Sequence, residues 1–189
     1  VLIDYEALVN DGDPQRGVRR VPIHEQVTTA VYRGWMLTVP QYTRLYDALA
    51  GKRVLLLNDP TAYRHCHWLP ESYSLIEDCT PKSVWMIFNG EIDIDRIMDL
   101  LKPFGTEPLI VKDFVKSRKH EWEEACFIPS ASDPHSVERV VRRFIELQGE
   151  DLAQGLVFRE FIEFEPLVRH SRSGMPLTVE YRIFWLDGE

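Results

Sequence analysis

In several stretches of the chain, apolar residues recur every three or four positions, a spacing that predicts amphipathic helices. The three clearest stretches cover residues 42–49, 94–101 and 137–147. The last has the best-defined start, because Asp133 is a favourable N-cap and Pro134 suits the first helical turn. We therefore expect three helices whose apolar faces pack against the rest of the protein.

Continuous apolar runs and segments rich in β-branched and aromatic residues predict strands. Runs at 54–57 and 85–88 are typical of strands buried on both faces of a parallel sheet, so residues 1–104 are predicted to form a small α/β domain with an extended lead-in. Pro103 and the turn formers that follow it indicate a boundary. Residues 105–189 then make up the second predicted domain.

In the second domain, the predicted order of elements is strand, charged segment, strand, helix, strand and strand. The four strands are expected at 109–111, 125–128, 156–164 and 177–186. The Ser-Arg-Ser-Gly sequence at 171–174 is a turn signal, so the last two strands are predicted to pair as an antiparallel hairpin. The charged segment at 113–124 is too irregular to predict a helix.

The composition restricts the class of protein. With 189 residues, 44% of them hydrophobic, the chain can bury a sizeable core. Its formal net charge of -8 disfavours nucleic acid as a partner, because binding a phosphate backbone depends on many lysine and arginine contacts. It has neither an apolar run of membrane-spanning length nor the layout of a signal peptide, and its three cysteines lack metal-ligand spacing. We therefore expect a cytoplasmic protein without membrane contact.

Both ends of the sequence are typical of a chain that has been cut from a longer one. The chain begins with Val1 and stops at 187–189, a turn signal directly after a predicted strand, where a further strand is expected. We therefore expect the sequence to be a fragment of a longer protein.

Lysines and an arginine near the first strand of the second domain are candidates for binding chemistry. Lys112 closes that predicted buried strand, where a charge is tolerated only if it is solvated or paired. A nucleotide triphosphate would pair it; alternatively, its stem covers apolar surface while the ammonium reaches water. The loop after it carries Lys116, Arg118 and Lys119, which could close over phosphates and stabilise phosphoryl transfer. A plain solvated loop is the other interpretation.

Two later strands carry further charged candidates. Glu160 lies among apolar neighbours in a predicted half-buried strand that leads into a hinge, or else it faces outward on an amphipathic strand. Glu180 and Arg182 are two positions apart, so their side chains share one face of a strand. From the residues alone, they could form an exposed ion pair with each other. Apolar residues on the opposite face would then make the core, namely Tyr181, Ile183 and Trp185.

The first domain contains two more groups of interest. His65, Cys66 and His67 would alternate in direction on an extended segment, and no second pair follows at ligand spacing, which disfavours a zinc site. Arg33 and Trp35 could anchor a substrate, although packing of Trp35 in the core is the favoured interpretation.

Several sequence motifs occur together in a characteristic order. Those of the second domain are VKDFVKSRKHEW at 111–122, FREFIEFEP at 158–166 and EYRIFWLDG at 180–188. Those of the first are YRGWML at 32–37 and NDPTAYRHCHWLPESY at 58–73. Together they resemble the ATP-grasp superfamily, and in particular the bacterial families of its divergent clade named for one arginine and two lysines. The resemblance covers nearly the whole chain.

The resemblance implies an ATP-grasp-like α/β fold. In it, a small α/β pre-ATP-grasp domain precedes an antiparallel-sheet-plus-helix nucleotide-binding subdomain, here without the C-terminal part of the fold. It also implies ATP and Mg²⁺ as cofactors, with magnesium ligands on strands beyond residue 189. The positions that match the family's ATP site are Lys112, Lys116 and Arg182 at the phosphates, where they would also be catalytic, Glu160, Phe161 and Ile162 near the adenine, and Glu180 at the ribose.

The leading hypothesis for function follows from this resemblance. The chain would be the ATP-binding portion of a carboxylate-amine ligase that works through an acyl phosphate, with an unidentified carboxylate and amine, the acceptor being a peptide or a protein. The eukaryotic branch of the clade implies an alternative, a non-catalytic ATP-binding assembly factor or protein-interaction module. Its candidate partner contacts would be Arg33, Trp35 and Trp68. A structural domain with a decayed site is the third interpretation.

Overall fold

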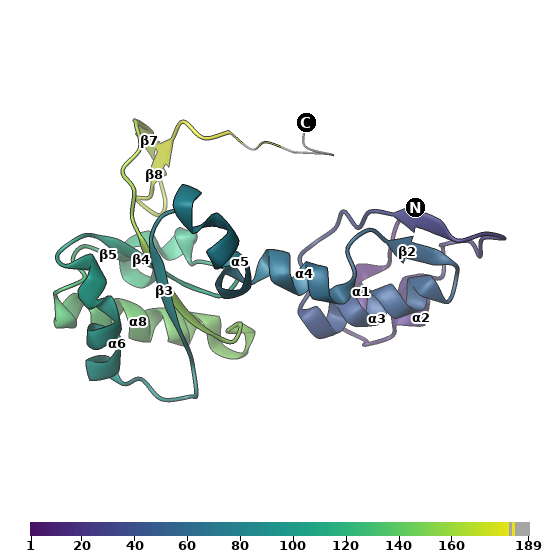
Figure 1. The fold of residues 1–189 in the computed structure, drawn as a ribbon, viewed down its shortest axis with the longest axis horizontal. Coiled ribbons are helices and arrows are strands. Elements are labelled where there is room, and N and C mark those ends of the chain that lie inside the picture. The colour runs from purple at the N-terminus through teal and green to yellow at the C-terminus, as the bar shows by residue number, and fades with distance from the viewer. Residues whose placement is uncertain (182, 184–189) are drawn as a thin grey trace. The chain divides into compact units, whose positions relative to one another are not determined.

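The structure is a computed structural model that describes residues 1–181 and 183. The chain divides into two compact units, Val1–Ser72 and Tyr73–Glu189 (Figure 1). The division falls earlier than the boundary predicted near Pro103, because the strand that precedes that proline belongs to the sheet of the second unit. The functional assignment of the two predicted domains stays a prediction.

The first unit packs helices against a pair of parallel strands. Its elements are α1 (Tyr5–Val9), α2 (Pro14–Gly17), β1 (Thr28–Ala30), α3 (Val39–Ala50), β2 (Val54–Leu56), α4 (Pro60–His67) and the start of α5 (Leu69–Ile76). Helix α3 was predicted, and a reciprocal capping box between Thr38 and Gln41 fixes its start. The prediction of parallel pairing is confirmed. The prediction that the strand β2 is buried on both faces is wrong, because Leu55 points away from the core and is 39% exposed.

The second unit is built on a four-stranded sheet with the order β3-β6-β4-β5. Its main elements are β3 (Ser83–Ile87), α6 (Ile94–Leu101), β4 (Leu109–Asp113), α7 (Trp122–Ala125), β5 (Phe127–Ile128), α8 (Pro134–Gln148), β6 (Gly155–Glu160), β7 (Pro166–Arg169) and β8 (Pro176–Thr178). All three strand pairings in this sheet are antiparallel. The run at 85–88 was expected in a parallel sheet, and that expectation is wrong, since an apolar run does not specify the direction of its partner.

The predicted hairpin exists, but with different strands. The turn at 171–174 connects β7 to β8, which pair antiparallel beyond the end of β6 (Figure 1). The predicted strand at 156–164 instead ends at Glu160 as β6 and pairs with β3 and β4. Its apolar composition reflects burial in the middle of the larger sheet, because Leu156, Val157 and Phe158 are all buried.

Helices α6 and α8 cover one face of the sheet and form the core of the second unit with it. Helix α8 starts as predicted at Pro134, after the N-cap Asp133, whose carboxylate accepts a hydrogen bond from the backbone N–H of His135 at 3.1 Å. Val137, Val140 and Phe144 face the sheet and are fully buried. The mixed α/β class and the antiparallel sheet with its helix are therefore confirmed.

Among the described residues, no helix combines the length and the apolar character needed to cross a membrane.

Candidate functional site

The two faces of the four-stranded sheet differ in what covers them. Alternation along β4 directs Leu109 and Val111 into the helix-covered core and puts Ile110 and Lys112 on the other face. On β6, Arg159 lies on the same face as Ile110, because the two residues are paired across the strands. The face that carries Ile110, Lys112 and Arg159 is called the outer face below.

Lys112 is a half-buried cation without an ionic partner. Its ammonium Nζ donates a hydrogen bond to the backbone carbonyl of Asp113 at 2.6 Å, and it forms no salt bridge with any described residue. Burial lowers the pKa of the Lys112 ammonium to about 8; Asp113 opposes this shift, and the Arg159 guanidinium adds to it. The side chain therefore carries an unneutralised charge in a site that disfavours charge.

Arg159 is a second cation on the outer face, and the sequence interpretation missed it. Its guanidinium Nη2 donates to the hydroxyl Oγ1 of Thr80 at 2.6 Å, and burial lowers its pKa. It is half-buried and forms no salt bridge within the described part of the chain. The signal that could have found it is the alternation of β6, where Arg159 follows the buried Phe158 and so must face the other way.

Two half-buried cations on one sheet face, neither of which forms a salt bridge with a described residue, favour an anionic ligand. Each would be stabilised by a group that brings several negative oxygens, as a polyphosphate does. Helix α5 borders this face at β3, where its Tyr73 ring packs edge-on against Trp85 at 5.4 Å. The electropositive part of the outer face thus lies between β3 and β5, around Lys112 and Arg159.

The predicted phosphate-covering loop begins as an ordered turn. Asp113 N–H donates to the carbonyl of Lys116 at 2.8 Å, and Ser117 forms a bridge with Lys112. The Lys116 side chain is exposed. Arg118 is held by a salt bridge to Glu121 at 3.1 Å, so it is not free to contact a ligand without breaking that pair.

The segment after β6 was predicted to meet an adenine. Glu160 pairs with Leu109 and so lies on the core side rather than on the outer face; its Oε2 accepts a hydrogen bond from the backbone N–H of Lys82 at 3.3 Å. Phe161 is half-buried, and its ring centroid lies 5.1 Å from that of Phe127. Ile162 is 36% exposed, and its backbone N–H and C=O have no hydrogen-bond partner among the described residues. The adenine assignment stays a prediction.

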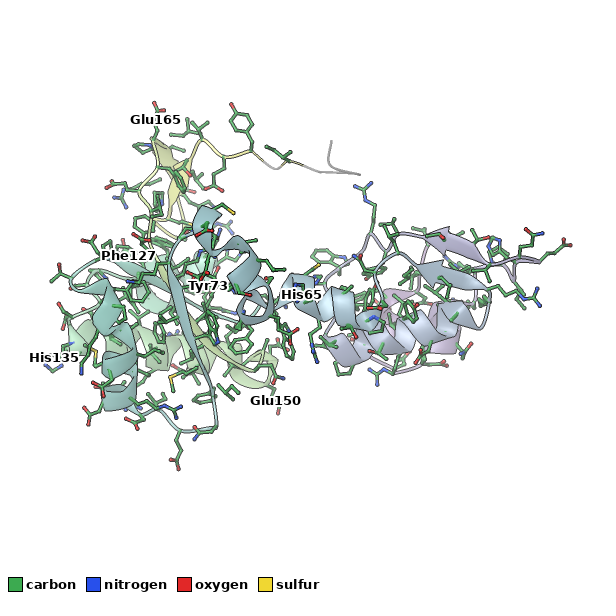
Figure 2. The ribbon with its side chains drawn as sticks, in the orientation of Figure 1. His65, Tyr73, Phe127, His135, Glu150 and Glu165 are labelled. Atoms are coloured by element: carbon green, nitrogen blue, oxygen red, sulfur yellow. The ribbon has the colours of Figure 1, made fainter. Side chains whose placement is uncertain are left out.

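Beyond this segment, Glu163 and Glu165 are exposed, and Glu165 projects away from the protein (Figure 2). These two carboxylates therefore do not contribute to the outer face.

The last predicted strand is shorter than expected. Strand β8 ends at Thr178, and the Thr178 hydroxyl donates to Oε1 of the exposed Glu180 at 2.7 Å. Arg182, and with it Trp185, lies outside the described residues. Tyr181 and Ile183 are 85% and 66% exposed, so the expectation that they pack in the core is wrong. The ribose role of Glu180 and the phosphate role of Arg182 stay predictions.

The first unit offers a separate cavity of about 300 Å³ lined by aromatic side chains. Its Tyr42 and Tyr63 rings stack with centroids 3.7 Å apart, and their hydroxyls are both bonded to backbone carbonyls. The His67 ring stacks on the Tyr63 ring, with the two centroids 3.9 Å apart. Both residues belong to the helix α4, so the extended conformation predicted for residues 65–67 is wrong. No group of three or more His, Cys, Asp or Glu side chains within residues 1–181 and 183 could hold a metal ion.

Trp35 is 78% exposed, which contradicts the favoured interpretation that it packs in the core. Trp35→Ala is expected to change the free energy of unfolding by less than about 0.5 kcal/mol, because an exposed side chain loses little packing. Tyr42→Ala, a buried control in the same unit, should cost about 3 kcal/mol or more. Chemical denaturation of both variants measures these values, and a loss at Trp35 equal to that at Tyr42 would contradict the exposed position.

Taken together, the fold and the outer face define an α/β domain whose antiparallel sheet presents paired cations suited to a phosphorylated ligand. Residues 103–189 match a family of ATP-grasp domains, the third family of the clade named for one arginine and two lysines. This part of the chain therefore belongs to the ATP-grasp superfamily, as the motifs predicted, and the family supports ATP binding and a ligase-like function. A comparison with curated proteins finds no match.

Proposed function

We propose that this chain is the ATP-binding part of a carboxylate-amine ligase that modifies a peptide or a protein. The observation that carries the proposal is the pair of half-buried cations, Lys112 and Arg159, on the outer face of an ATP-grasp sheet. No described carboxylate forms a salt bridge with either of them, and a polyphosphate would neutralise both.

In the proposed reaction, a carboxylate oxygen of the first substrate attacks the γ-phosphorus of ATP. The bond between this phosphorus and the β,γ-bridging oxygen breaks, and ADP leaves with the electron pair. The amine of the second substrate then attacks the acyl carbon of the resulting acyl phosphate. Inorganic phosphate leaves, the amine nitrogen loses a proton, and an amide is formed.

The residues of this chain would act by positioning and by charge neutralisation. Lys112, Arg159 and Lys116 would contact the phosphate oxygens, as would Arg182, and they would hold the transferring group in line. The Phe161 ring and the free backbone groups of Ile162 would contact the adenine, with Glu160 beside them, while Glu180 would accept a hydrogen bond from the ribose.

Mg²⁺ is proposed as the second cofactor, because it neutralises phosphate charge when it accompanies a nucleotide. The described residues do not provide a set of ligands for it, so it is assigned no protein ligand and no step here.

The proposal is tested by calorimetric titration of the full-length protein with Mg–ATP. The unmodified protein should give one saturable binding event, and Arg159→Met should weaken it by about tenfold, because a charged hydrogen bond to phosphate is lost. Arg182→Ala is expected to have an effect of similar size. The absence of binding by the unmodified protein, or equal affinities for all three proteins, would overturn the assignment.

A second candidate function is supported by the exposure of Trp35 and Arg33 in the first unit. Exposed tryptophan and arginine are common anchors of protein partners. In this alternative, the chain binds ATP as an assembly factor or interaction module and catalyses no ligation. An assay of ADP release with panels of amino acids and peptides separates the two functions. Acceptor-dependent release favours the ligase, and ATP binding without such turnover favours the alternative.

A further inference from the structure

The carboxylate of Asp113 is fully buried directly after Lys112 on β4. Its Oδ1 accepts hydrogen bonds from the backbone N–H of Val115 at 2.6 Å and from that of Lys116. Its Oδ2 accepts from Nε2 of Gln148 at 2.8 Å and from the backbone N–H of Ala153 at 3.3 Å. Four donors therefore compensate the burial of this charge, which would otherwise be very unfavourable.

The backbone of Asp113 binds both proposed phosphate ligands as well. Its carbonyl accepts the hydrogen bond from Lys112 Nζ at 2.6 Å, and its N–H donates to the Lys116 carbonyl at 2.8 Å. One residue thus contacts the ammonium of Lys112 and closes the turn from which Lys116 projects. The turn at 113–117 is closed by these bonds, and the backbone N–H of Phe114 adds a further one to the carbonyl of Ala153 at 3.3 Å.

Gln148 extends this arrangement to α8 and to the rest of the basic segment. It is the buried last residue of α8, and while its Nε2 donates to Asp113, its Oε1 accepts from Nη1 of Arg118 at 3.5 Å. Arg118 in turn pairs with Glu121. The basic segment is therefore attached to the helix layer through a buried, fully bonded polar network, which favours one conformation over many.

We infer that Asp113 is the positioning residue of the proposed nucleotide site: its buried carboxylate, held by Gln148, fixes the turn that sets Lys116 relative to Lys112. This inference rests on the proposed ATP-binding function. Asp113 itself faces away from the outer face, so it would not contact a phosphate bound there. Its effect is on the arrangement of the two lysines and, through its charge, on the protonation of Lys112.

The electrostatic part of this role makes a distinct prediction. Asp113 raises the pKa of Lys112, against the lowering effects of burial and of Arg159, the two other influences on this ammonium. Removing the negative charge therefore lowers the pKa of Lys112 further. Because phosphate binding requires the protonated ammonium, the pH at which Mg–ATP affinity declines should move to a lower value. A residue with a purely structural role would not move this midpoint.

The test compares the full-length protein with its Asp113→Asn variant by Mg–ATP calorimetry between about pH 6 and about pH 10. We expect the variant to bind about tenfold more weakly at neutral pH, since its amide NH₂ group would face other donors, and to lose affinity at a lower pH. Equal affinity and an unchanged midpoint would overturn the inference. If the unmodified protein fails to bind Mg–ATP, the proposed function itself is overturned.

Two further variants distinguish positioning from general damage. Gln148→Met keeps the size and the helix preference of the residue but removes its bond to Asp113, and it should weaken Mg–ATP binding by a few-fold while the protein remains folded. In the double variant Asp113→Asn with Gln148→Glu, the new amide NH₂ group at position 113 can donate a hydrogen bond to the new carboxylate at position 148. This variant should therefore recover most of the affinity lost in Asp113→Asn. If Asp113→Asn does not fold, wild-type affinity in Gln148→Met decides against the inference, and weakened affinity supports it.

Discussion

Replacing Lys112 by methionine is expected to raise the dissociation constant for Mg–ATP by about 30-fold to 100-fold, equivalent to roughly 2–3 kcal/mol. Methionine keeps the apolar stem that occupies the half-buried site and removes only the ammonium. The loss therefore measures the charge on the outer face rather than its packing. Calorimetric titration of the full-length protein and of the variant gives both constants.

The pH dependence of binding should identify the same charge. The pKa of Lys112 is lowered to about 8, so in the free protein this ammonium is protonated at neutral pH and loses its proton as the pH rises through 8. Affinity of the unmodified protein for Mg–ATP should decline in that range, whereas Lys112→Met should bind weakly on both sides of it. Parallel pH profiles for the two proteins would exclude Lys112 from the phosphate site.

Lys112→Met should make the folded protein more stable even though it weakens Mg–ATP binding. The folded pKa of Lys112 lies below its ordinary value of 10.5, so the folded state binds this proton less tightly than the unfolded state. Burial of the ammonium is therefore unfavourable below about pH 8, and this cost disappears as the pH rises toward 10.5. Without nucleotide at neutral pH, Lys112→Met should unfold at a higher denaturant concentration than the unmodified protein. Loss of both stability and binding would indicate a structural role instead.

The sequence predicted α3, α6 and α8 well because their signals are local, whereas it predicted an extended conformation where α1, α2 and α4 lie and did not predict α5 or α7. The stripe of apolar residues in α8, its Asp133 cap and its proline are contained within the helix and its immediate flank. The same holds for α3 and α6, whose bounds agree with the predicted apolar stretches. Side-chain spacing and caps are enough for such elements, and tertiary contacts were not needed to find them.

Strand pairing was predicted less well because it is a property of distant segments. The run at 85–88 does not indicate its partner, its direction or its register. In the structure it pairs antiparallel with β6, a strand far along the chain, with Trp85 opposite Val157. The composition of 156–164 likewise predicts a strand but not its neighbours. The hairpin was therefore expected between the wrong strands, even though its turn at 171–174 was correct.

The candidate site shows the same limit. Lys112 was found from its position at the end of an apolar strand, and the structure does put it on the outer face of the sheet, opposite the face that α6 and α8 cover. Arg159 was missed, although it shares that face, because its proximity to Lys112 arises only from the pairing of β4 with β6. The role of Asp113 could not be predicted either, since its partners Gln148 and Ala153 are distant in sequence.

Gly155→Ala is expected to destabilise the second unit by about 3 kcal/mol or more. Gly155 opens β6 opposite Ile87, and a Cβ atom at this position would lie 2.2 Å from the backbone carbonyl oxygen of Met86 and 2.9 Å from the Cα of Ile87. Both are main-chain atoms of β3, so no side-chain rotation can relieve the overlap. The two strands would have to separate at the start of β6.

The same displacement should weaken nucleotide binding, because β6 carries Arg159 and pairs with the strand that carries Lys112. Gly51→Ala is a suitable control: the added Cβ would lie 3.5 Å from its nearest neighbour at a negative φ, so its effect should be within about 1 kcal/mol. Denaturant unfolding and Mg–ATP titration of both variants test this. If Gly155→Ala matched Gly51→Ala in both measurements, the close approach of β3 and β6, and with it the placement of Arg159 on the outer face, would have to be abandoned.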